Sequence, residues 1–600
     1  MDLFGYILLT LIDMSDNGLN HLDNMDEVFL GFNFIVFIHA FSRIYVYHAL
    51  VTDEQHSYCL SWEFSISFPY SEDEVFLGFN ITVFIHAFRR IYVYRALVTD
   101  EQNLEWKAYP CSPLLQVSGA LRLFCAGYFR DWKGCAEGPW KLPFFGSIHH
   151  LITGEQTHHR FYRLAQKYGP LFNIKLGNVN FVVASSSSTA REVLNTHDLV
   201  LASRPTLLAV EMIGYKSSGI GFSPYGPYWR QLRKICTVEL LSAKKVKSLG
   251  FIRYEEAHNL LHNIRTNAGS PLNLTEMFQV VSNTQITRTV IGKECTSRQR
   301  FILAMKETIK LLPMLRVADL FPSFSFLISL LDGSSFQMKR LYREMDQILE
   351  EIISEHKENA AVADEMEEDF VDVLLRIQEK GQLQVPITMD NVKAVILDML
   401  VAATETTSNT MCWIMSELIR HPEVMSMAQK EIREVLGSKI KIEDDDINNL
   451  HYLHNVVKET LRLHPPLPLL LPRTSSEAIE LLGFVIPTKA RVVVNAWAIA
   501  RDPKIWKNPN SFCPDRFNGS THDIKGTNYE YIPFGSGRRI CPGMTFAMAG
   551  MELFLSLLLL HFDWEIPGGT DPMELDMEEV FDGTARRKKD LYLIAIPHSF

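Results

Sequence analysis

Cysteine is scarce in this chain, which has 9 cysteines in 600 residues and no two of them at a C-x-x-C spacing. This scarcity excludes a disulfide scaffold and favours a reducing compartment. An excess of basic residues is also lacking, because the formal net charge at pH 7 is -11, which argues against nucleic acid as the main partner. The length is ample for a large buried core.

The chain also lacks a long apolar run that is free of charge. Residues 1–12 are apolar but too short to cross a bilayer. Residues 28–51 are long enough, yet they contain Arg43, and a central arginine costs about 2.5–3.5 kcal/mol on insertion scales. Aromatic and β-branched residues dominate this stretch, so a buried strand or hairpin is an equally good interpretation. We expect no cleaved signal peptide.

A stretch of 30 residues occurs twice near the N-terminus, at residues 26–55 and 73–102. The second copy differs from the first only in the residues that match Phe34, Ile35, Ser42 and His48. Two copies are too few for a solenoid, because such folds need about three stacked units to bury a core. We therefore predict that residues 1–137 are an atypical segment outside the working domain, produced by a recent duplication or by an error in the gene model.

From Gly138 onward the sequence predicts one domain, residues 138–600, that is mainly α with a small β portion. Apolar periodicity indicates helices at residues 157–168, 187–196, 228–241, 338–359, 392–420, 444–463 and 544–561. Alternating residues predict short strands at residues 171–183, with a turn at Gly177-Asn178, and at residues 479–495. Residues 360–368 are acidic and predict a solvated loop.

A glycine-rich loop near the C-terminus has the pattern F-x-x-G-x-R-x-C-x-G, from Phe534 to Gly543. Gly537 and Gly543 let the backbone turn sharply and approach a flat ring system closely. Arg539 offers a guanidinium that suits a carboxylate, and Cys541 offers a thiolate of the kind that binds haem iron. The plainer alternative, a buried structural cysteine in a glycine-rich turn, leaves this spacing unexplained.

An ion pair is expected on the helix before Pro465. Glu459 and Arg462 are three positions apart, so their carboxylate and guanidinium share one helix face and can pair. Further along, Pro514-Asp-Arg516-Phe517 supplies another arginine. An E-x-x-R pattern alone is weak evidence for a functional site, because any exposed helix can carry one.

A polar run from Thr404 to Thr410 interrupts the apolar helix expected at residues 392–420. Threonine is a poor helix former, and a local rule broken inside a core element indicates function. The hydroxyl and carboxylate of Glu405-Thr406 can relay protons through water in a dry pocket. In the alternative without chemistry, these threonines only bond the carbonyls four residues before them.

These patterns, in this order, make residues 138–600 similar to the cytochrome P450 family. Within it the chain resembles plant A-type members, terpenoid hydroxylases of the premnaspirodiene oxygenase kind. Further stretches that carry the resemblance are residues 138–143, 222–226, 239–244 and 459–466. The resemblance implies the cytochrome P450 fold and a haem-thiolate monooxygenase, which inserts one atom of O2 into a C–H bond of a hydrophobic small molecule and reduces the other to water.

The resemblance also assigns site residues. It implies haem b as the cofactor, with Cys541 as the axial ligand of the iron. The residues that it places around the haem are Phe534, Gly537, Gly543, Arg539, Trp229, Arg233 and Arg473. It places Arg516 with the Glu459–Arg462 pair, behind the thiolate, as structural support. It gives Thr406 a hydrogen bond to O2 and Glu405 the supply of protons.

Partners and location follow from the same resemblance. Electrons would come from NADPH through cytochrome P450 reductase, docked where Arg233, Lys234 and Arg538 offer positive charge. Family members attach to the cytosolic face of the endoplasmic reticulum membrane. The resemblance places the substrate pocket in four mostly apolar segments: residues 204–224, the helix face with Leu397, Val401 and Ala402, residues 467–471 and residues 581–585.

The sequence departs from the family pattern at three places. Ala403 stands where a glycine lets the helix pass over the haem and opens an oxygen groove, so the added methyl narrows that groove. Asp515 replaces the usual glutamate of P-E-R-F. Residues 135–139 replace the Pro-rich hinge that follows the usual membrane anchor, so membrane attachment is implied by the family alone.

Two alternatives to the monooxygenase are open. A haem-thiolate isomerase or dehydratase rearranges hydroperoxides without O2 and does not need the acid–alcohol pair, so Glu405-Thr406 argues against it. NADPH consumption with reductase separates these two enzymes. The second alternative is an inactive product of a damaged gene, which the N-terminal repeat favours and the intact residues Cys541, Glu459 and Arg462 oppose.

Overall fold

The computed structural model describes residues 137–292, 298–309, 311, 315–360, 368–437, 439 and 441–598. The duplicated stretches at residues 26–55 and 73–102 lie outside the described residues, as does most of the acidic loop expected at residues 360–368.

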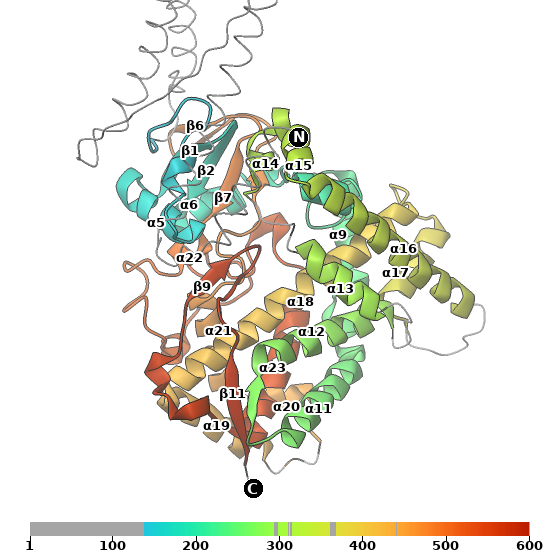
Figure 1. Ribbon diagram of the computed structural model, residues 1–600, viewed down its shortest axis with the longest axis vertical. Helices are drawn as coiled ribbons and strands as arrows, with labels where there is room; N and C mark the ends of the chain where they lie inside the picture. Colours follow the sequence, from blue (N-terminus) through green and yellow to red (C-terminus); the bar gives the residue numbers. More distant parts are fainter. Residues whose placement is uncertain are drawn as a thin grey trace, which may run out of the picture. The chain divides into compact units, whose positions relative to one another are not determined.

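Helices dominate the described chain (Figure 1). The longer ones are α5 (Thr157–Tyr168), α9 (Pro227–Ile235), α11 (Gly250–Thr266), α12 (Leu274–Ile291), α13 (Arg298–Ile309), α16 (Ser334–Ala360), α17 (Phe370–Lys380), α18 (Met389–Arg420), α19 (Pro422–Leu436), α21 (His451–Leu463) and α23 (Met544–His561). The shorter ones are α6 (Ser187–Arg191), α7 (Asp198–Leu201), α8 (Leu208–Ile213), α10 (Ala243–Ser248), α14 (Val317–Leu320), α15 (Ser325–Leu331), α20 (Asp444–Ile447) and α22 (Ala496–Ile499). The expected helices at residues 157–168 and 544–561 are confirmed to the residue.

The strands form several small sheets, and the largest of them lies at one end of the described part (Figure 1). One sheet has the order β1 (Leu171–Leu176), β2 (Val179–Ala184), β7 (Arg491–Val494) and β4 (Arg473–Thr474). The others are β3 (Pro271–Asn273), β11 (Tyr592–Pro597) and β8 (Phe562–Glu565), then β9 (Glu579–Phe581) with β10 (Ala585–Arg587), then β5 (Ile479–Leu481) with β6 (Phe484–Ile486). The antiparallel pair β1–β2 confirms the strands expected at residues 171–183.

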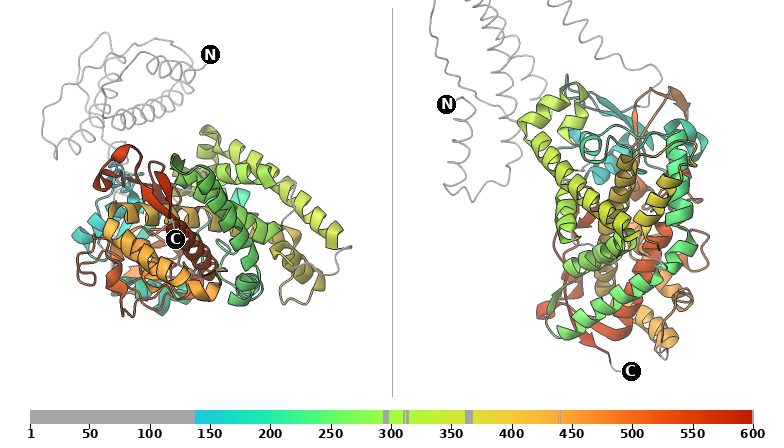
Figure 2. Two further views of the ribbon diagram at one scale, coloured as in Figure 1. Left: turned by 90° about the horizontal axis from the view of Figure 1, so that it is seen from below. Right: turned by 90° about the vertical axis from the view of Figure 1, so that its right-hand side faces the viewer.

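Helix α18 forms the centre of the helical part and crosses it beside α12 (Figure 1). It begins with a capping box between Thr388 and Asn391, which satisfies backbone N–H groups of the first turn. It ends before Pro422, which cannot continue a helix. Most of its side chains are buried, whereas α16 lies at the outside (Figure 2). A residue on α18 is therefore well placed to face the interior of the domain.

Helix α20 and helix α21 replace the single helix expected at residues 444–463. The break falls at residues 448–450 because Glu431, on α19, accepts hydrogen bonds from the backbone N–H groups of Tyr452 and Leu453 at 2.8 and 3.0 Å. This carboxylate caps the start of α21 from another element. The helix expected at residues 228–241 also changes form, continuing after α9 as a π-helix, η3 (Cys236–Leu240).

Helix α23 is the one helix, within the described ranges, that is long and apolar enough to cross a membrane by length and composition. Most of it is buried inside the protein, where it packs with α18, α19 and α21 in the largest hydrophobic cluster. It also carries the chain away from the cysteine loop, so the loop is mounted on a core element.

Candidate active site

The cysteine loop is held in a tight turn before α23. The backbone N–H of Cys541 donates to the carbonyl of Phe534 at 3.0 Å, and the Phe534 ring packs against the core that contains α23. Gly537 has a φ of 71°, and a Cβ there would lie 2.2 Å from the carbonyl oxygen of Leu194. Only glycine fits this close approach.

The Cys541 thiol is accessible but lies among protein groups that shift its pKa. Its side chain is exposed, yet burial raises the pKa of the thiol, while the backbone N–H of Gly543 and the Arg233 guanidinium lower it. A positive partner, such as a metal ion, would favour the thiolate over the thiol.

Asp198, at the start of α7, anchors the cysteine loop, a role that was not predicted from sequence. Its carboxylate accepts from the backbone N–H of Arg538 at 2.8 Å and from Nη1 of Arg473 at 2.5 Å. The other Nη of Arg473 donates to the carbonyl of Ser536 at 3.1 Å. Arg473 thus holds the loop instead of standing free, and Asp198 could have been found only as a polar residue in the apolar stretch before Arg204.

Arg539 lies in a crowded group of positive charges. It donates to the carbonyls of Ala202, Ile220 and Ser223, and its guanidinium is 4.1 Å from the ring centre of Trp229. Burial, together with the positive charges of Arg473 and Arg233, lowers the pKa of Arg539 to about 9.

Arg204 adds a further buried guanidinium that sequence analysis did not single out. It donates to the carbonyls of Leu471 and Pro472 at 2.7 and 2.9 Å. Burial lowers its pKa well below the usual value, and Arg473 and Arg539 lower it further. Among the residues that the structure describes, Asp198 is the only carboxylate that pairs with one of these guanidinium groups. The excess positive charge fits an anionic group with two carboxylates, as haem has.

Trp229 and Arg233, four residues apart on α9, have different partners. Trp229 is buried and its Nε1–H donates to the carbonyl of Ile220 at 3.0 Å. Arg233 is half-buried; burial lowers its pKa, and the Cys541 thiolate raises it. The structure therefore brings Trp229 to Arg539 and Arg233 to the thiol.

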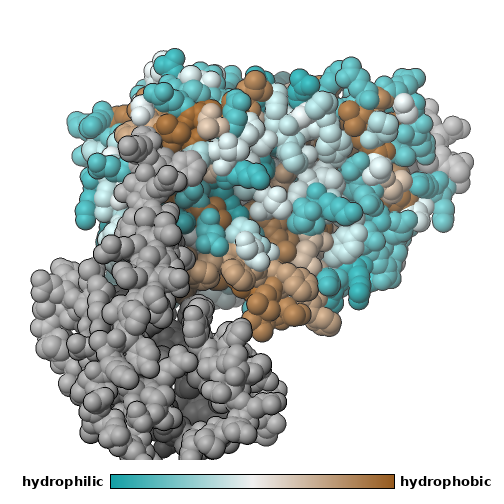
Figure 3. Space-filling view, turned by 90° about the horizontal axis from the view of Figure 1, so that it is seen from above, coloured by the Kyte–Doolittle hydropathy of each residue, from teal (hydrophilic) through white to brown (hydrophobic). Residues whose placement is uncertain are grey.

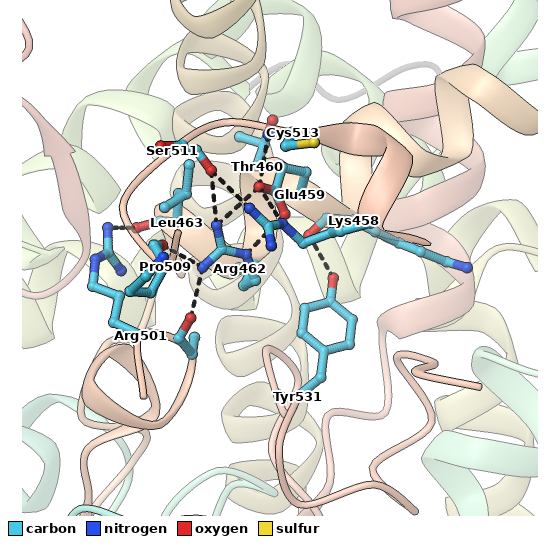
Figure 4. Close-up of polar contacts among 12 residues, drawn as sticks. Lys458, Glu459, Thr460, Arg462, Leu463, Arg501, Pro509, Ser511, Cys513 and Tyr531 are labelled. Carbon is cyan, nitrogen blue, oxygen red and sulfur yellow. Dashed lines mark hydrogen bonds and ion pairs between the residues drawn. The ribbon is translucent and has the colours of Figure 1, made fainter. Parts of the chain in front are cut away.

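A buried ion pair lies between α21 and the segment before the cysteine loop (Figure 4). Nε and Nη2 of Arg462 each donate to the Glu459 carboxylate at 2.8 Å, and both side chains are fully buried. Arg516 Nε and the backbone N–H of Cys513 donate to the same carboxylate at 2.8 and 2.9 Å. The pair is bidentate and fully hydrogen-bonded, the arrangement in which a buried ion pair is stable.

Arg462 also binds the backbone around this pair (Figure 4). Nη1 donates to the carbonyls of Ala500 and Pro509 at 2.7 and 2.6 Å, and Nη2 to that of Ser511 at 3.2 Å. Asp515 is exposed and accepts only a local bond from Asn518 at 2.9 Å. The change from glutamate to aspartate at residue 515 thus leaves the network complete.

Thr406 lies on the partly exposed side of α18. Its hydroxyl donates to the carbonyl of Ala402 at 2.8 Å, the type of bond that Thr404 and Thr410 also make. Thr404 and Thr410 are buried, however, while Thr406 is half-buried and Ala402 is exposed in the middle of the helix. Helix α18 therefore borders open space at Thr406, and Ala403 beside it packs against the core.

Glu405 points to the turn between β9 and β10. Its carboxylate accepts from the Thr584 hydroxyl at 3.1 Å, and that hydroxyl accepts from Asn409 Nδ2 at 3.0 Å. Burial raises the pKa of Glu405, partly offset by the bond from Thr584. A carboxyl with a raised pKa holds a proton closer to neutral pH. Thr584 and Asn409 were not found from sequence.

The segments expected to line the substrate pocket lie on several elements. Leu469 and Phe581, from two of them, line one apolar cavity of about 70 Å³ together with Phe161, Phe181 and Val493. Leu397 is buried in the core and Val401 is half-buried, whereas Ala402 is exposed. Of the helix positions expected in the pocket, Ala402 has the most free surface.

Comparison with known proteins agrees with this geometry. The family model described as Cytochrome P450 matches residues 137–594. Desmethyl-deoxy-podophyllotoxin synthase of Sinopodophyllum hexandrum is 49% identical over 495 residues, 82% of this chain and 97% of the relative. Premnaspirodiene oxygenase of Hyoscyamus muticus is 46% identical over 480 residues, 78% of this chain and 95% of the relative.

A solved structure supports the same assignment. A zebrafish cytochrome P450 with progesterone superposes with a TM-score of 0.65 at 26% identity, covering 74% of this chain and all of the other. Members of the matched family hold haem through a cysteine thiolate and are oxygenases. The chain therefore belongs to the cytochrome P450 family, with the mainly helical fold of that family, and is a haem-thiolate monooxygenase.

Proposed function

We propose that the protein hydroxylates a hydrophobic small molecule, a terpenoid or another plant specialised metabolite, with O2 and with electrons from NADPH delivered by cytochrome P450 reductase. The observations that carry this proposal are the exposed Cys541 thiol in the cysteine loop and the free surface of Ala402 and Thr406 in the middle of the otherwise buried helix α18. The named functions of the relatives, premnaspirodiene oxygenase and 5-epiaristolochene 1,3-dihydroxylase, support the substrate class.

In this proposal Cys541 is the axial ligand of haem b, and the haem supplies the activation of O2 for insertion into a C–H bond. Arg539 and Trp229 would hold the propionate groups of the haem. Arg473 and Arg233 contribute charge, while Asp198 fixes the loop. The excess of guanidinium groups supports this role, because two propionates would balance them.

Thr406 and Glu405 are proposed to hold and move protons. Burial raises the pKa of Glu405, which supports a carboxyl that can hold a proton, while the bond from Thr584 orients it and partly offsets the shift. A hydroxyl and a carboxyl that are adjacent on one helix can pass a proton through one water molecule to O2.

The variant Thr406→Ala is expected to lower product formation by about a hundredfold, since positioned proton transfer contributes about 10²–10⁴-fold. NADPH consumption should continue, with the electrons appearing as hydrogen peroxide. The measurement is the ratio of product to NADPH consumed. Thr404→Ala is the matched control, because Thr404 makes the same carbonyl bond at 2.8 Å but is buried. An equal loss of this ratio in both variants would contradict the proton role of Thr406.

Reconstitution with reductase tests the reaction itself. The purified protein is supplied with reductase, NADPH and a panel that includes premnaspirodiene and 5-epiaristolochene, and products are identified by mass spectrometry. We expect a product with one added oxygen atom and NADPH consumption that depends on substrate. Turnover of hydroperoxides without NADPH would support the isomerase or dehydratase instead, and failure to bind haem would support the damaged gene.

The reductase is proposed to dock where Lys234 and Arg538 are exposed, beside the cysteine loop. Both side chains lie near the thiolate side of the proposed haem, on α9 and on the loop. An acidic partner surface would be attracted here, and this attraction should weaken as salt is raised.

Attachment to the cytosolic face of the endoplasmic reticulum membrane is part of the proposal. An apolar surface supports it, formed by exposed large side chains of η4 (Pro322–Phe324), α14, α15 and the start of α16: Val317, Phe324, Phe326, Leu327, Leu330, Leu331 and Phe336. Figure 3 shows apolar side chains gathered on one face at this end of the molecule. Apolar patches of this kind mark contacts with membranes or other proteins.

Changing Phe326, Leu330 and Phe336 together to serine should reduce binding to phospholipid vesicles by at least about tenfold, since burial of each such side chain contributes roughly 1.5–3 kcal/mol. Vesicle sedimentation measures this. Leu482→Ser is the control, because Leu482 is also an exposed large apolar residue, at 54%, but lies on the β5–β6 turn. Unchanged binding would show that this surface does not contact the membrane.

A further inference from the structure

Asp398 is a carboxylate in α18 that the proposed chemistry does not use. It lies one turn before Ala402, and it accepts a hydrogen bond from the backbone N–H of Gly221 at 2.8 Å and another from the backbone N–H of Ile220. Burial raises the pKa of Asp398 to about 6, although these bonds lower it. The bonds join α18 to a loop far away in sequence, residues 214–221, which we name the strap.

The strap has an unfavourable backbone conformation. Tyr215, Lys216 and Ser217 have φ values of 50°, 57° and 57°, the left-handed region that residues with a Cβ avoid. Three such residues in a row do not persist unless the surroundings hold them. The strap must therefore be fastened by contacts outside itself.

Contacts at both ends fasten the strap. At its beginning, the Tyr215 hydroxyl donates to Asp346 on α16 at 2.9 Å. In the middle, the Tyr228 hydroxyl donates to the carbonyl of Ser218 at 2.6 Å. At its end the strap meets Asp398, and a Cβ on Gly219 would lie only 2.2 Å from Asp398 Oδ2.

Ile220 connects the strap to the proposed haem site. Its N–H donates to Asp398, and its carbonyl accepts from Trp229 Nε1 at 3.0 Å and from Arg539 Nη1 at 3.2 Å. One peptide segment is thus held by α18 on one side and by two proposed haem-binding residues on the other. A displacement of the strap would move both Trp229 and Arg539.

We propose that Asp398 is a positioning residue that holds the strap closed against α18 and thereby sets the affinity for substrate, since the strap lies within residues 204–224, a proposed wall of the pocket. The effect on substrate affinity rests on the proposed function. The closure of the strap is independent of the proposed function, because it can be measured without turnover.

The test is limited trypsin digestion of the full-length holoprotein, because Lys216 is exposed within the strap. The variant Asp398→Ala is expected to increase the rate of cleavage after Lys216 by at least about tenfold, because it removes hydrogen bonds to a charged acceptor. Asp398→Asn keeps one acceptor oxygen, so its cleavage rate should lie between those of the wild type and Asp398→Ala. Glu434→Ala is the control, as an exposed acidic residue on α19, and should cleave like the wild type. Equal cleavage in Asp398→Ala and wild type overturns the proposal.

Kinetics with a substrate from the panel provide the second measurement. Asp398→Ala should raise KM by at least about fivefold with kcat changed less than about twofold, the pattern of lost substrate binding. Faster cleavage with unchanged KM overturns the role in affinity.

Gly219→Ala covers the case in which Asp398→Ala does not fold. Its added methyl should push the strap from Asp398 and increase cleavage after Lys216, and an unchanged rate overturns the proposal.

Discussion

Replacement of Cys541 by alanine is expected to abolish monooxygenase activity and the thiolate-type spectrum of the carbon monoxide complex. The reason is chemical: the thiolate is the proposed ligand that donates electron density to the iron and favours O–O cleavage. The cysteine loop should still form, because its turn depends on Gly537 and on the bond from the residue 541 N–H to the Phe534 carbonyl. The measurement is the reduced carbon monoxide difference spectrum of the purified variant.

Cys513→Ala is the matched control for this experiment. Cys513 lies in the same part of the chain and is half-buried, but its structural contact is made by its backbone N–H, which bonds Glu459 and is kept in the variant. We expect this control to retain the wild-type spectrum. A Cys541→Ala protein that bound haem with a thiolate-type spectrum would refute the ligand assignment.

The variant Arg462→Ala is expected to prevent accumulation of folded protein. It leaves the fully buried Glu459 carboxylate without its bidentate partner, and breaking a buried pair costs about 3–5 kcal/mol. It also removes the donor that binds the carbonyls of Ala500, Pro509 and Ser511. Whole proteins are stable by only about 5–15 kcal/mol. Soluble yield, haem content and the urea midpoint of unfolding measure the effect.

An exposed pair supplies the control for Arg462. Lys430 and Glu434 are 4.0 Å apart on α19, with 74% and 66% of their side chains exposed. Glu434→Gln should change the free energy of unfolding by less than about 1 kcal/mol, as surface ion pairs do. Arg462→Lys keeps the charge but not the bidentate geometry, so its free energy of unfolding should lie between those of the wild type and Arg462→Ala. Wild-type stability of Arg462→Ala would contradict the supporting role of this network.

Local signals in the sequence located elements whose ends depend on nearby residues. Helix α5 ends where Gly169-Pro170 stops it, and α18 ends before Pro422. The turn at Gly177-Asn178 joins β1 and β2 because Gly177 adopts a φ of 59° at little cost. The break before α21 was not predictable in this way, because the capping carboxylate of Glu431 comes from a different helix.

Within the site, the residues with a distinctive spacing were found and those without one were missed. Glu459 and Arg462 share a helix face at a spacing of three, so their pairing is a property of one element. Asp198 and Arg204 occur in no pattern, and they meet the cysteine loop and residues 471–472 only in the folded chain. Thr584 likewise reaches Glu405 from a strand turn.

The sequence by itself determined the family and predicted the cysteine loop and the Glu405–Thr406 pair as site residues, because these depend on residue types at short, regular spacings. Tertiary structure decided which charges meet, since the hydrogen bonds of Asp198 to Arg473 and of Asp398 to Gly221 join segments that are distant in sequence. Burial, too, exists only in the fold. It raises the pKa of Glu405 and of Cys541 because removal from water disfavours the charged form of an acid.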